Sequence, residues 1–236
     1  MGASRESSSA TGVNGDQTNR SSQDGGASGA VYVFTRSDET WRQQAYLKAS
    51  NTGFMDHFGW SVALDGDTLA VGAPYESSRA TGVNGDQSDN GMHHSGAVYI
   101  FTRDGRDWRQ QAYLKPSRTA AGAGFGRSVA LDGDTLAVGS RGAIHGEDQD
   151  ARASGAVRVF RRDGTIWHQQ AYLTASHGDV WDGFGESISL DGDTLAVAAH
   201  NEASRAIGVN GDERDNTARL EPRPYSGRWR GAGAVF

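Results

Sequence analysis

Hydrophobic residues in this chain occur in short alternating runs between clusters of Gly, Asn, Asp and Ser. Within 61–64 and 68–73, large Val and Leu side chains alternate with small Ser, Ala and Gly side chains, and a period of two predicts β-strands. A two-residue turn at 66–67 would place large residues opposite large ones, with Leu64 facing Leu69. A four-residue loop would preserve that pairing. The predicted hairpin has one large face and one small face, which suits stacked sheets.

The same hairpin recurs along the chain together with two further repeated strands, so each repeated unit is predicted to hold four strands. The hairpin motif begins at Phe58, Phe125 and Phe184, the motif Ser-Gly-Ala-Val at Ser28, Ser95 and Ser154, and the motif Trp-x-Gln-Gln-Ala-Tyr-Leu at Trp41, Trp108 and Trp167. Units of about 60 to 80 residues suit a four-stranded propeller blade with its loops. The three tryptophans are predicted to be equivalent residues that pack between blades.

We therefore predict an all-β fold, a β-propeller-like array of about three four-stranded antiparallel blades that forms a partial propeller. The expected segments are an N-terminal polar loop segment (1–27), a half blade (28–57), two blades (58–124 and 125–183) and a partial blade (184–236). Three blades are too few to close a ring, since closed propellers have about 4 to 8 blades. We expect either adjoining blades from a longer chain or a homo-oligomer, most economically a head-to-tail dimer of six blades.

Composition narrows the classes of partner. The 236 residues carry a formal net charge of −6 and no stripe of Lys and Arg, so nucleic acid is not expected as a partner. The chain has no apolar run long enough for membrane insertion, and its first residues contain no apolar segment typical of a signal peptide. The sequence contains no Cys, which excludes disulfides and thiolate metal sites.

The Phe-Gly at 58–59 and the Gly-Ala-Pro at 72–74 resemble the FG-GAP repeat of the integrin α-subunit β-propeller, and the neighbouring motifs are similar to those of bacterial FG-GAP repeat proteins. Residues 28–236 would then form FG-GAP blades. The resemblance implies an extracellular or cell-surface location and a role in adhesion or ligand binding, often with Ca²⁺. Gly-Ala-Pro is intact only once, because the other copies read Gly-Ser at 139–140 and Ala-Ala at 198–199.

Two short motifs invite a chemical interpretation. The family's calcium loop, of the type Asp-x-Asp-x-Asp-Gly-x-x-Asp, is replaced here by Asp-Gly-Asp-Thr at 65–68. A tight turn with two carboxylates offers too few oxygens for Ca²⁺, which takes six to eight, so we expect this turn to be empty. Ser61 has an equivalent in each of two other units, whereas a nucleophile is needed once, so we expect a structural serine.

A long loop follows the second strand of each unit, and one copy offers oxygen-bearing side chains at alternate positions. These side chains belong to Asn84, Asp86, Ser88 and Asn90. Alternate spacing lets such oxygens converge on a hard cation, so any Ca²⁺ that binds is expected here. The alternative is an Asn-Gly turn inside an ordered loop without metal.

Alternating connections place these long loops on the same rim as the loops that enter each hairpin, with the tight turns on the other rim. Four aromatic residues of the long-loop rim are Phe54, Trp60, Tyr75 and Trp181. We expect them to contact a ligand, although packing under their own loops is an equally open alternative. His93 and His94 are adjacent, would point to opposite faces of an extended strand, and are expected to be solvent-exposed.

The sequence thus favours a non-catalytic binding or adhesion module that recognises a protein or a glycan through the long-loop rim. A purely structural repeat segment of a larger cell-surface protein is the alternative. A hydrolase on a propeller scaffold is less favoured, because the sequence shows no single set of acid, base and nucleophile.

Overall fold

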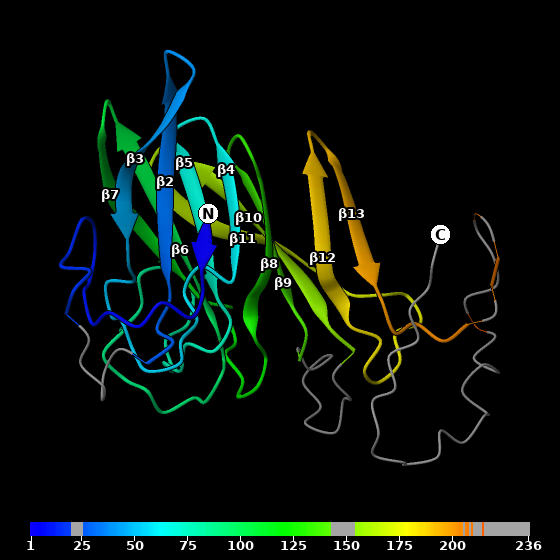
Figure 1. Cartoon of the computed structure of the whole chain (residues 1–236). Helices are drawn as coiled ribbons and strands as arrows, with labels where there is room; N and C mark the ends of the chain where they lie inside the picture. The colour runs from blue at the N-terminus through cyan, green and yellow to red at the C-terminus, as the bar shows by residue number, and fades with distance from the viewer. Residues whose placement is uncertain (20–25, 143–153, 205, 208, 210–213, 215–236) are drawn as a thin grey trace, which may run out of the picture. The chain divides into compact units, whose positions relative to one another are not determined.

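The computed structural model describes residues 1–19, 26–142, 154–204, 206, 207, 209 and 214 (Figure 1). Its contacts divide the chain into two units, Met1–Glu202 and Ala203–Phe236, and all the strands lie in the first. Every regular element of the described residues is a β-strand. The strands are β1 (Gly2–Ala3), β2 (Ala30–Ser37), β3 (Thr40–Leu47), β4 (Ser61–Asp65), β5 (Thr68–Ala73), β6 (Ala97–Asp104), β7 (Asp107–Leu114), β8 (Phe125–Asp132), β9 (Thr135–Ser140), β10 (Ala156–Asp163), β11 (Ile166–Leu173), β12 (Phe184–Asp191) and β13 (Thr194–Ala199).

The strands form four antiparallel sheets, which confirms the predicted all-β array of blades. The first blade is β1–β2–β3, the second β4–β5–β6–β7, the third β8–β9–β10–β11 and the fourth β12–β13. Neighbours in each sheet are also neighbours in the order of strands along the chain. Among the described residues, no helix is long and apolar enough to cross a membrane.

The predicted hairpin register is confirmed in the second blade. Leu64 pairs with Leu69, and Asp65 pairs with Thr68, which leaves Gly66 and its neighbour as a two-residue turn. Gly66 has a φ of 52°, a left-handed conformation that glycine adopts without strain. In Figure 1 such tight turns lie at the upper end of the sheets and the long loops at the lower end, as the alternating connections predict.

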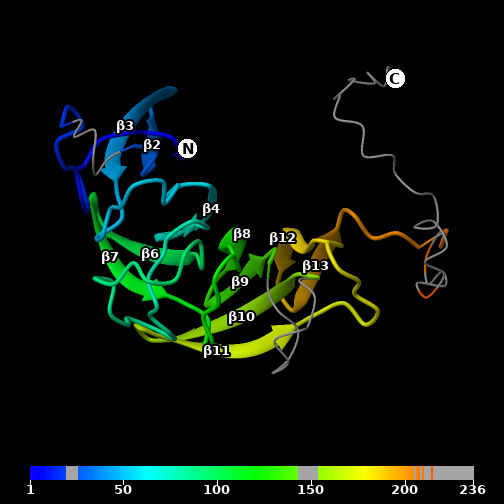
Figure 2. The same ribbon diagram turned by 90° about the horizontal axis from the view of Figure 1, so that it is seen from below.

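Consecutive blades lie face to face (Figure 2), and large residues of one blade pack against small residues of the next. Between the second and third blades, Leu136 and Val138 of β9 are fully buried against the face of the second blade that carries Ala70. The half-buried Val129 and Leu131 of β8 pack in the same cluster. The small face leaves the space that the large face fills, so stacking buries apolar area that one sheet alone leaves in water.

The three equivalent tryptophans do not have equivalent surroundings. Trp108 is 5% exposed and Trp167 is 2% exposed. The indole Nε1 of Trp108 donates to Gln44 Oε1 of the first blade, and that of Trp167 donates to Gln111 Oε1 of the second, both at 2.9 Å. Trp41 is 66% exposed, so the prediction that all three pack between blades is wrong for Trp41. Within the described residues, no blade precedes the first one to cover it.

Buried ion pairs hold the long loops onto the sheets. Lys115 Nζ lies 2.8 Å from Glu76 Oε2 with both side chains fully buried, and Lys48 Nζ lies 3.0 Å from Glu6 Oε2. Burial lowers the pKa of both lysines, although the glutamates oppose this effect. Each lysine also donates to a serine hydroxyl at the start of the third-strand motif, Lys115 to that of Ser95 at 2.7 Å. These ion pairs and hydrogen bonds therefore hold the first residues of the lower-rim loops in place against the sheets.

Candidate ligand-binding site

The residue that follows Phe-Gly occupies the same place on the rim in each blade, and it differs from blade to blade. In the second, third and fourth blades it is Trp60, Arg127 and Glu186. The Arg127 guanidinium carbon lies 4.6 Å from the centroid of the Trp60 ring, and Arg127 Nη2 lies 2.8 Å from Glu186 Oε1. Consecutive blades thus create a row of aromatic, basic and acidic side chains by placing one repeat position side by side.

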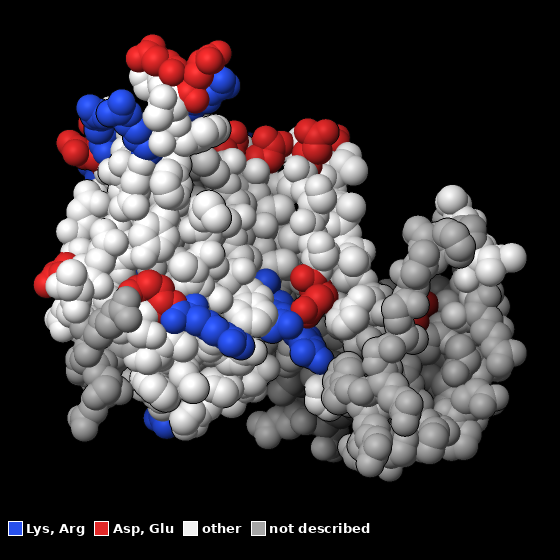
Figure 3. Space-filling view, in the orientation of Figure 1, with Lys and Arg blue, Asp and Glu red and all other residues white. Residues whose placement is uncertain are grey.

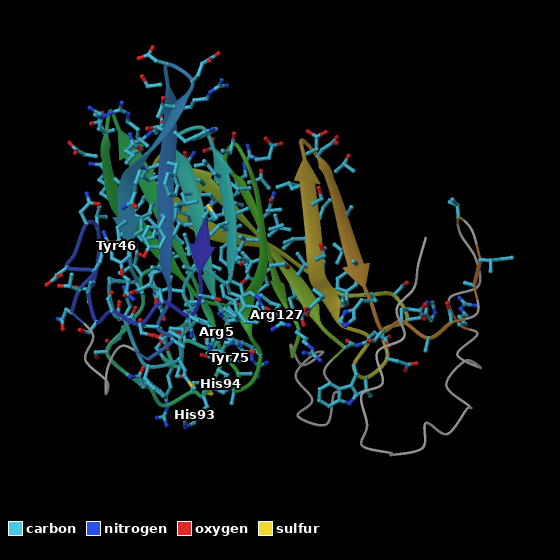
Figure 4. All side chains as sticks on the ribbon, viewed as in Figure 1. Arg5, Tyr46, Tyr75, His93, His94 and Arg127 are labelled. Atoms are coloured by element: carbon cyan, nitrogen blue, oxygen red, sulfur yellow. The ribbon has the colours of Figure 1, made fainter. Side chains whose placement is uncertain are left out.

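Tyr75 stands at the centre of a cluster of rings beside this row (Figure 4). Its ring centroid lies 5.0 Å from that of His57, 5.7 Å from that of Trp60 and 5.0 Å from that of His94. Most of these pairs are edge-to-face, the geometry that aromatic rings prefer. Arg127 also interacts electrostatically with Tyr75, which joins the ring cluster to the row.

A hollow of about 250 Å³ opens next to Tyr75. Its lining comes from the second, third and fourth blades and consists of Pro74, Tyr75, His94, Gly122, Gly124, Arg127, Arg141, Gly142 and Trp181. Trp181 is 66% exposed, and Asn201 Nδ2 donates to its carbonyl oxygen at 3.0 Å. The hollow is therefore lined by an exposed indole, a half-buried phenol and two guanidinium groups.

The structure brings together three of the four aromatic residues predicted for the rim. Tyr75 and Trp181 line the hollow, and Trp60 contacts Tyr75. Phe54 does not line it, because its ring lies over Gly26 in the first loop, where it is 57% exposed. The prediction missed His57, His94, Arg127 and Glu186. The sequence did contain a sign of Arg127 and Glu186. The residue between Phe-Gly and Ser differs in each of the three repeats, while the residues on both sides of it are the same.

The charge around the hollow is mainly positive. Arg5 and Arg127 lie on the same face as the ring cluster, and Arg141 lines the hollow (Figures 3 and 4). Figure 3 shows many acidic side chains along the upper edge of the sheets and others beside the basic side chains of this face. For Arg127, burial lowers the pKa, but the hydrogen bond and the charge of Glu186, together with Tyr75, more than restore it. Arg127 therefore remains a cation that can pair with a ligand's negative charge.

The pKa of His57 is lowered, first by burial and then by the positive charge of Arg5. His57 is thus neutral near pH 7, and its Nδ1 is buried with no hydrogen-bond partner in the described part of the chain. His93 and His94 do not lie on an extended strand. They form a turn, with ring centroids 6.2 Å apart and a φ of 53° at His94. Both are exposed, as predicted, but His94 also lines the hollow.

The loop proposed for a cation uses three of its four oxygen-bearing side chains in structural hydrogen bonds. Asn84 Oδ1 accepts from the backbone N–H of Tyr113, and Asp86 Oδ1 accepts from both the backbone and the hydroxyl of Ser88. These bonds with Ser88 lower the pKa of Asp86. Asn90 is exposed. In the described residues, no three His, Cys, Asp or Glu side chains cluster as metal ligands, and Ca²⁺ binding at Asn84–Asn90 stays a prediction.

The Asp-Gly-Asp turns and the repeated serines connect blades. Asp65 Oδ2 accepts from the backbone N–H of Gly133 in the next blade at 2.7 Å, and Asp132 does the same for Gly192. The Ser61 hydroxyl donates to the carbonyl oxygen of Gly126 at 2.8 Å. Ser128 repeats this bond to Gly185 at 2.7 Å. These contacts give Ser61 and Ser128 the structural role predicted for them.

Comparison with known proteins agrees with this architecture. The family model for the FG-GAP repeat matches residues 41–101, 108–160 and 167–214, which is more than half of the chain. The chain belongs to the FG-GAP repeat family. It is also 30% identical to mouse integrin alpha-X over 130 residues, a match that covers 53% of this chain and 11% of the integrin. The matched region is thus about a tenth of the length of that relative.

The FG-GAP motif itself serves packing in this protein. Phe58 is fully buried and makes edge-to-face contacts with Tyr99 and Phe101. Gly72 lies so close to the next blade that a Cβ there would overlap the carbonyl oxygen of Gly126. The repeated Phe and Gly residues of the motif therefore set the spacing between blades, while the residue after Phe-Gly, which differs between blades, lies on the long-loop rim.

Proposed function

We propose that this FG-GAP module is a non-catalytic binding or adhesion module that recognises a glycan or protein partner through the hollow beside Tyr75. The observation that carries the proposal is the convergence of Tyr75, Trp181 and Arg127 from three successive blades on one hollow. Exposed aromatic rings provide flat apolar surface for sugar faces or protein side chains, and a guanidinium gives directional hydrogen bonds.

The positive charge favours a partner with acidic groups. Arg127 and Arg141 line the hollow and Arg5 lies on the same face, whereas Glu186 is the one acidic side chain that contacts Arg127 in the described structure. The similarity to mouse integrin alpha-X supports an extracellular or cell-surface setting for such binding. A purely structural repeat segment is the competing function.

A glycan array and a cell-surface binding assay test the proposal with matched variants. Tyr75→Ala and Trp181→Ala should each weaken binding at least about tenfold, because truncating a central aromatic residue of a binding site removes roughly 2 kcal/mol. Phe54→Ala is the control, since Phe54 is also exposed but lies outside the hollow. Equal losses in all three variants would contradict the site. No binding in either assay would favour the structural alternative.

A further inference from the structure

An apolar groove of about 510 Å³ lies between the first and second blades, outside the proposed ligand site. Side chains that line it include Val33, Phe34, Trp41, Val62, Leu64 and Leu69. Leu64 is 60% exposed and Val62 is 41% exposed, although both stand on the large face of the second blade. Large aliphatic residues on a sheet face that is otherwise buried indicate an incomplete interface.

The complete interface between the second and third blades shows what covers this face. There, the equivalents of Val62 and Leu64 are Val129 and Leu131, which pack in a cluster with Ala63 and Ala70 of the preceding hairpin. The first blade has no hairpin of this kind among the described residues. The edge of β2 is occupied only by the short β1, which pairs with Ala30 and Val31. This pairing corresponds to that of the last two residues of β5 with the start of β6 in the second blade.

At the other end of the array, the fourth blade exposes a small-residue face of the kind that covers the large face in a complete interface. In β12 and β13 the larger residues are half-buried, whereas the small residues of the opposite face are exposed. The exposed small residues are Ser187, Ser189, Ala196 and Ala198. In addition, β13 has an edge that pairs with no other described strand, while β5 and β9 pair with β6 and β10 along the same edge.

We propose that the β12–β13 hairpin of a second copy of this chain adds to the edge of β2 and places its small face in the groove. The pairing of β5 with β6 gives the register, because Thr68 pairs with Thr102 there. By equivalence, Thr194 of one copy lies opposite Thr35 of the other. The added hairpin completes a four-stranded blade and removes an exposed strand edge from each copy.

In the proposed dimer, polar groups on the fourth and third blades of one copy also find hydrogen-bond partners on the second and first blades of the other. Asp65 and Asp132 each accept a hydrogen bond from a turn glycine of the next blade, and Asp191 is the exposed equivalent at the far end. Its partner in the second copy is the backbone N–H of Gly66. Likewise, the exposed Gln170 is the equivalent of the residues that accept from Trp108 and Trp167, so its partner is the exposed Trp41 of the second copy.

Each copy carries both surfaces, so two copies can exchange hairpins reciprocally. The result has two complete blades from each copy and two composite blades, or six in total, which lies within the range of closed propellers. This association rests on the groove and the hairpin alone and does not depend on the proposed ligand site.

Two features limit the strength of this association. First, β1 occupies the part of β2 that residues 197–199 of the second copy would pair with, so β1 must be displaced. Second, Ala198 stands where Gly72 stands in β5, and a Cβ at that place approaches the backbone of the neighbouring blade too closely. The proposal therefore predicts a reversible dimer that Ala198→Gly strengthens.

A disulfide between single-cysteine variants tests the register, because the chain has no cysteine of its own. Thr194→Cys is mixed with Thr35→Cys under mild oxidation, and a covalent heterodimer of two 25.1 kDa chains is expected. In the control, Thr102→Cys replaces Thr35→Cys, since Thr102 is already paired with Thr68 in its own blade. A heterodimer yield no greater than that of the control would overturn the proposal.

Sedimentation measures the same association without oxidation. Leu64→Asp should weaken dimerisation at least about tenfold, because it places a charge in the apolar groove. Met55→Asp replaces another exposed apolar residue away from the groove and should have no effect. A wild-type chain that stays monomeric up to the highest soluble concentration, with Ala198→Gly monomeric too, would contradict the second copy as the occupant. Unchanged dimerisation of Leu64→Asp would contradict the groove as the site.

Discussion

The closed interfaces between consecutive blades and the open surfaces of the first and second blades are built from nearly the same repeated sequence, yet they differ in burial. Trp108 and Trp167 are buried with their indole N–H groups bonded to the preceding blade, whereas Trp41 is exposed. Val129 and Leu131 pack against small residues, whereas Val62 and Leu64 face a groove. The comparison teaches that the neighbouring blade, and not the repeat sequence alone, decides whether a side chain is part of the core.

The largest expected effect comes from truncating the buried tryptophans. Trp108→Ala or Trp167→Ala should lower the free energy of unfolding by about 3 to 5 kcal/mol, because each change leaves a cavity between two blades. Trp41→Ala, the matched exposed variant, should lower it by less than about 1 kcal/mol. Chemical denaturation of the three variants measures the difference. Equal losses in all three would show that the face of Trp41 is covered in solution.

A methyl group between blades should have the next largest effect. Gly72→Ala or Gly139→Ala places a Cβ against a carbonyl oxygen of the next blade, so we expect a loss of about 1 to 3 kcal/mol. At the equivalent position of β13, Ala198→Gly should change the stability of the monomer by less than about 1 kcal/mol. Thermal unfolding of dilute protein compares them, and a stable Gly72→Ala variant would mean that the blades are less closely spaced than described.

The buried Asp56 should make stability depend on pH. Burial, and then the charge of Glu76, raises the pKa of Asp56 to about 7. Between about pH 4 and pH 7 the folded chain holds a proton there that the unfolded chain has lost, so stability falls as the pH rises through this window. Asp56→Asn should be about 1 to 3 kcal/mol more stable than wild type at pH 8 and nearly equal at pH 4.5. Parallel pH profiles of the two proteins would contradict this role.

The hydrogen bonds between turns should have the smallest effect. Asp65→Asn weakens the bond to the Gly133 N–H, and the expected loss is about 0.5 to 1.5 kcal/mol. Asp191→Asn is the control, because Asp191 is the exposed equivalent in the fourth blade and should change monomer stability little. Denaturation midpoints at low protein concentration measure both. A larger loss for Asp191→Asn would mean that the fourth blade is covered even in dilute solution.

Much of this fold could be predicted from the sequence, because the alternation of large and small residues fixes the hairpin register and the repeats fix the number of strands. Leu64 opposite Leu69 is one example. The exposure of Trp41 could not be predicted, because its position in the repeat is identical to that of Trp108 and only the arrangement of blades separates them.

The candidate site was only partly predictable for a related reason. Trp60, Tyr75 and Trp181 were found as aromatic residues in long loops, but Phe54 has the same description and lies elsewhere. Arg127 comes from a strand, and it reaches the site because one blade sets its rim residue beside that of the next. Side-chain neighbours across blades depend on three-dimensional stacking, which a single sequence does not specify locally.

Oxidative footprinting of the three equivalent tryptophans tests most directly the claim that the neighbouring blade determines burial. The wild-type chain is exposed to hydroxyl radicals in dilute solution, and mass spectrometry measures the modification rate of each tryptophan in one sample. Trp41 should be modified much faster than Trp108 and Trp167, in line with their exposed fractions of 66%, 5% and 2%. Equal protection of all three in the dilute monomer would contradict the account.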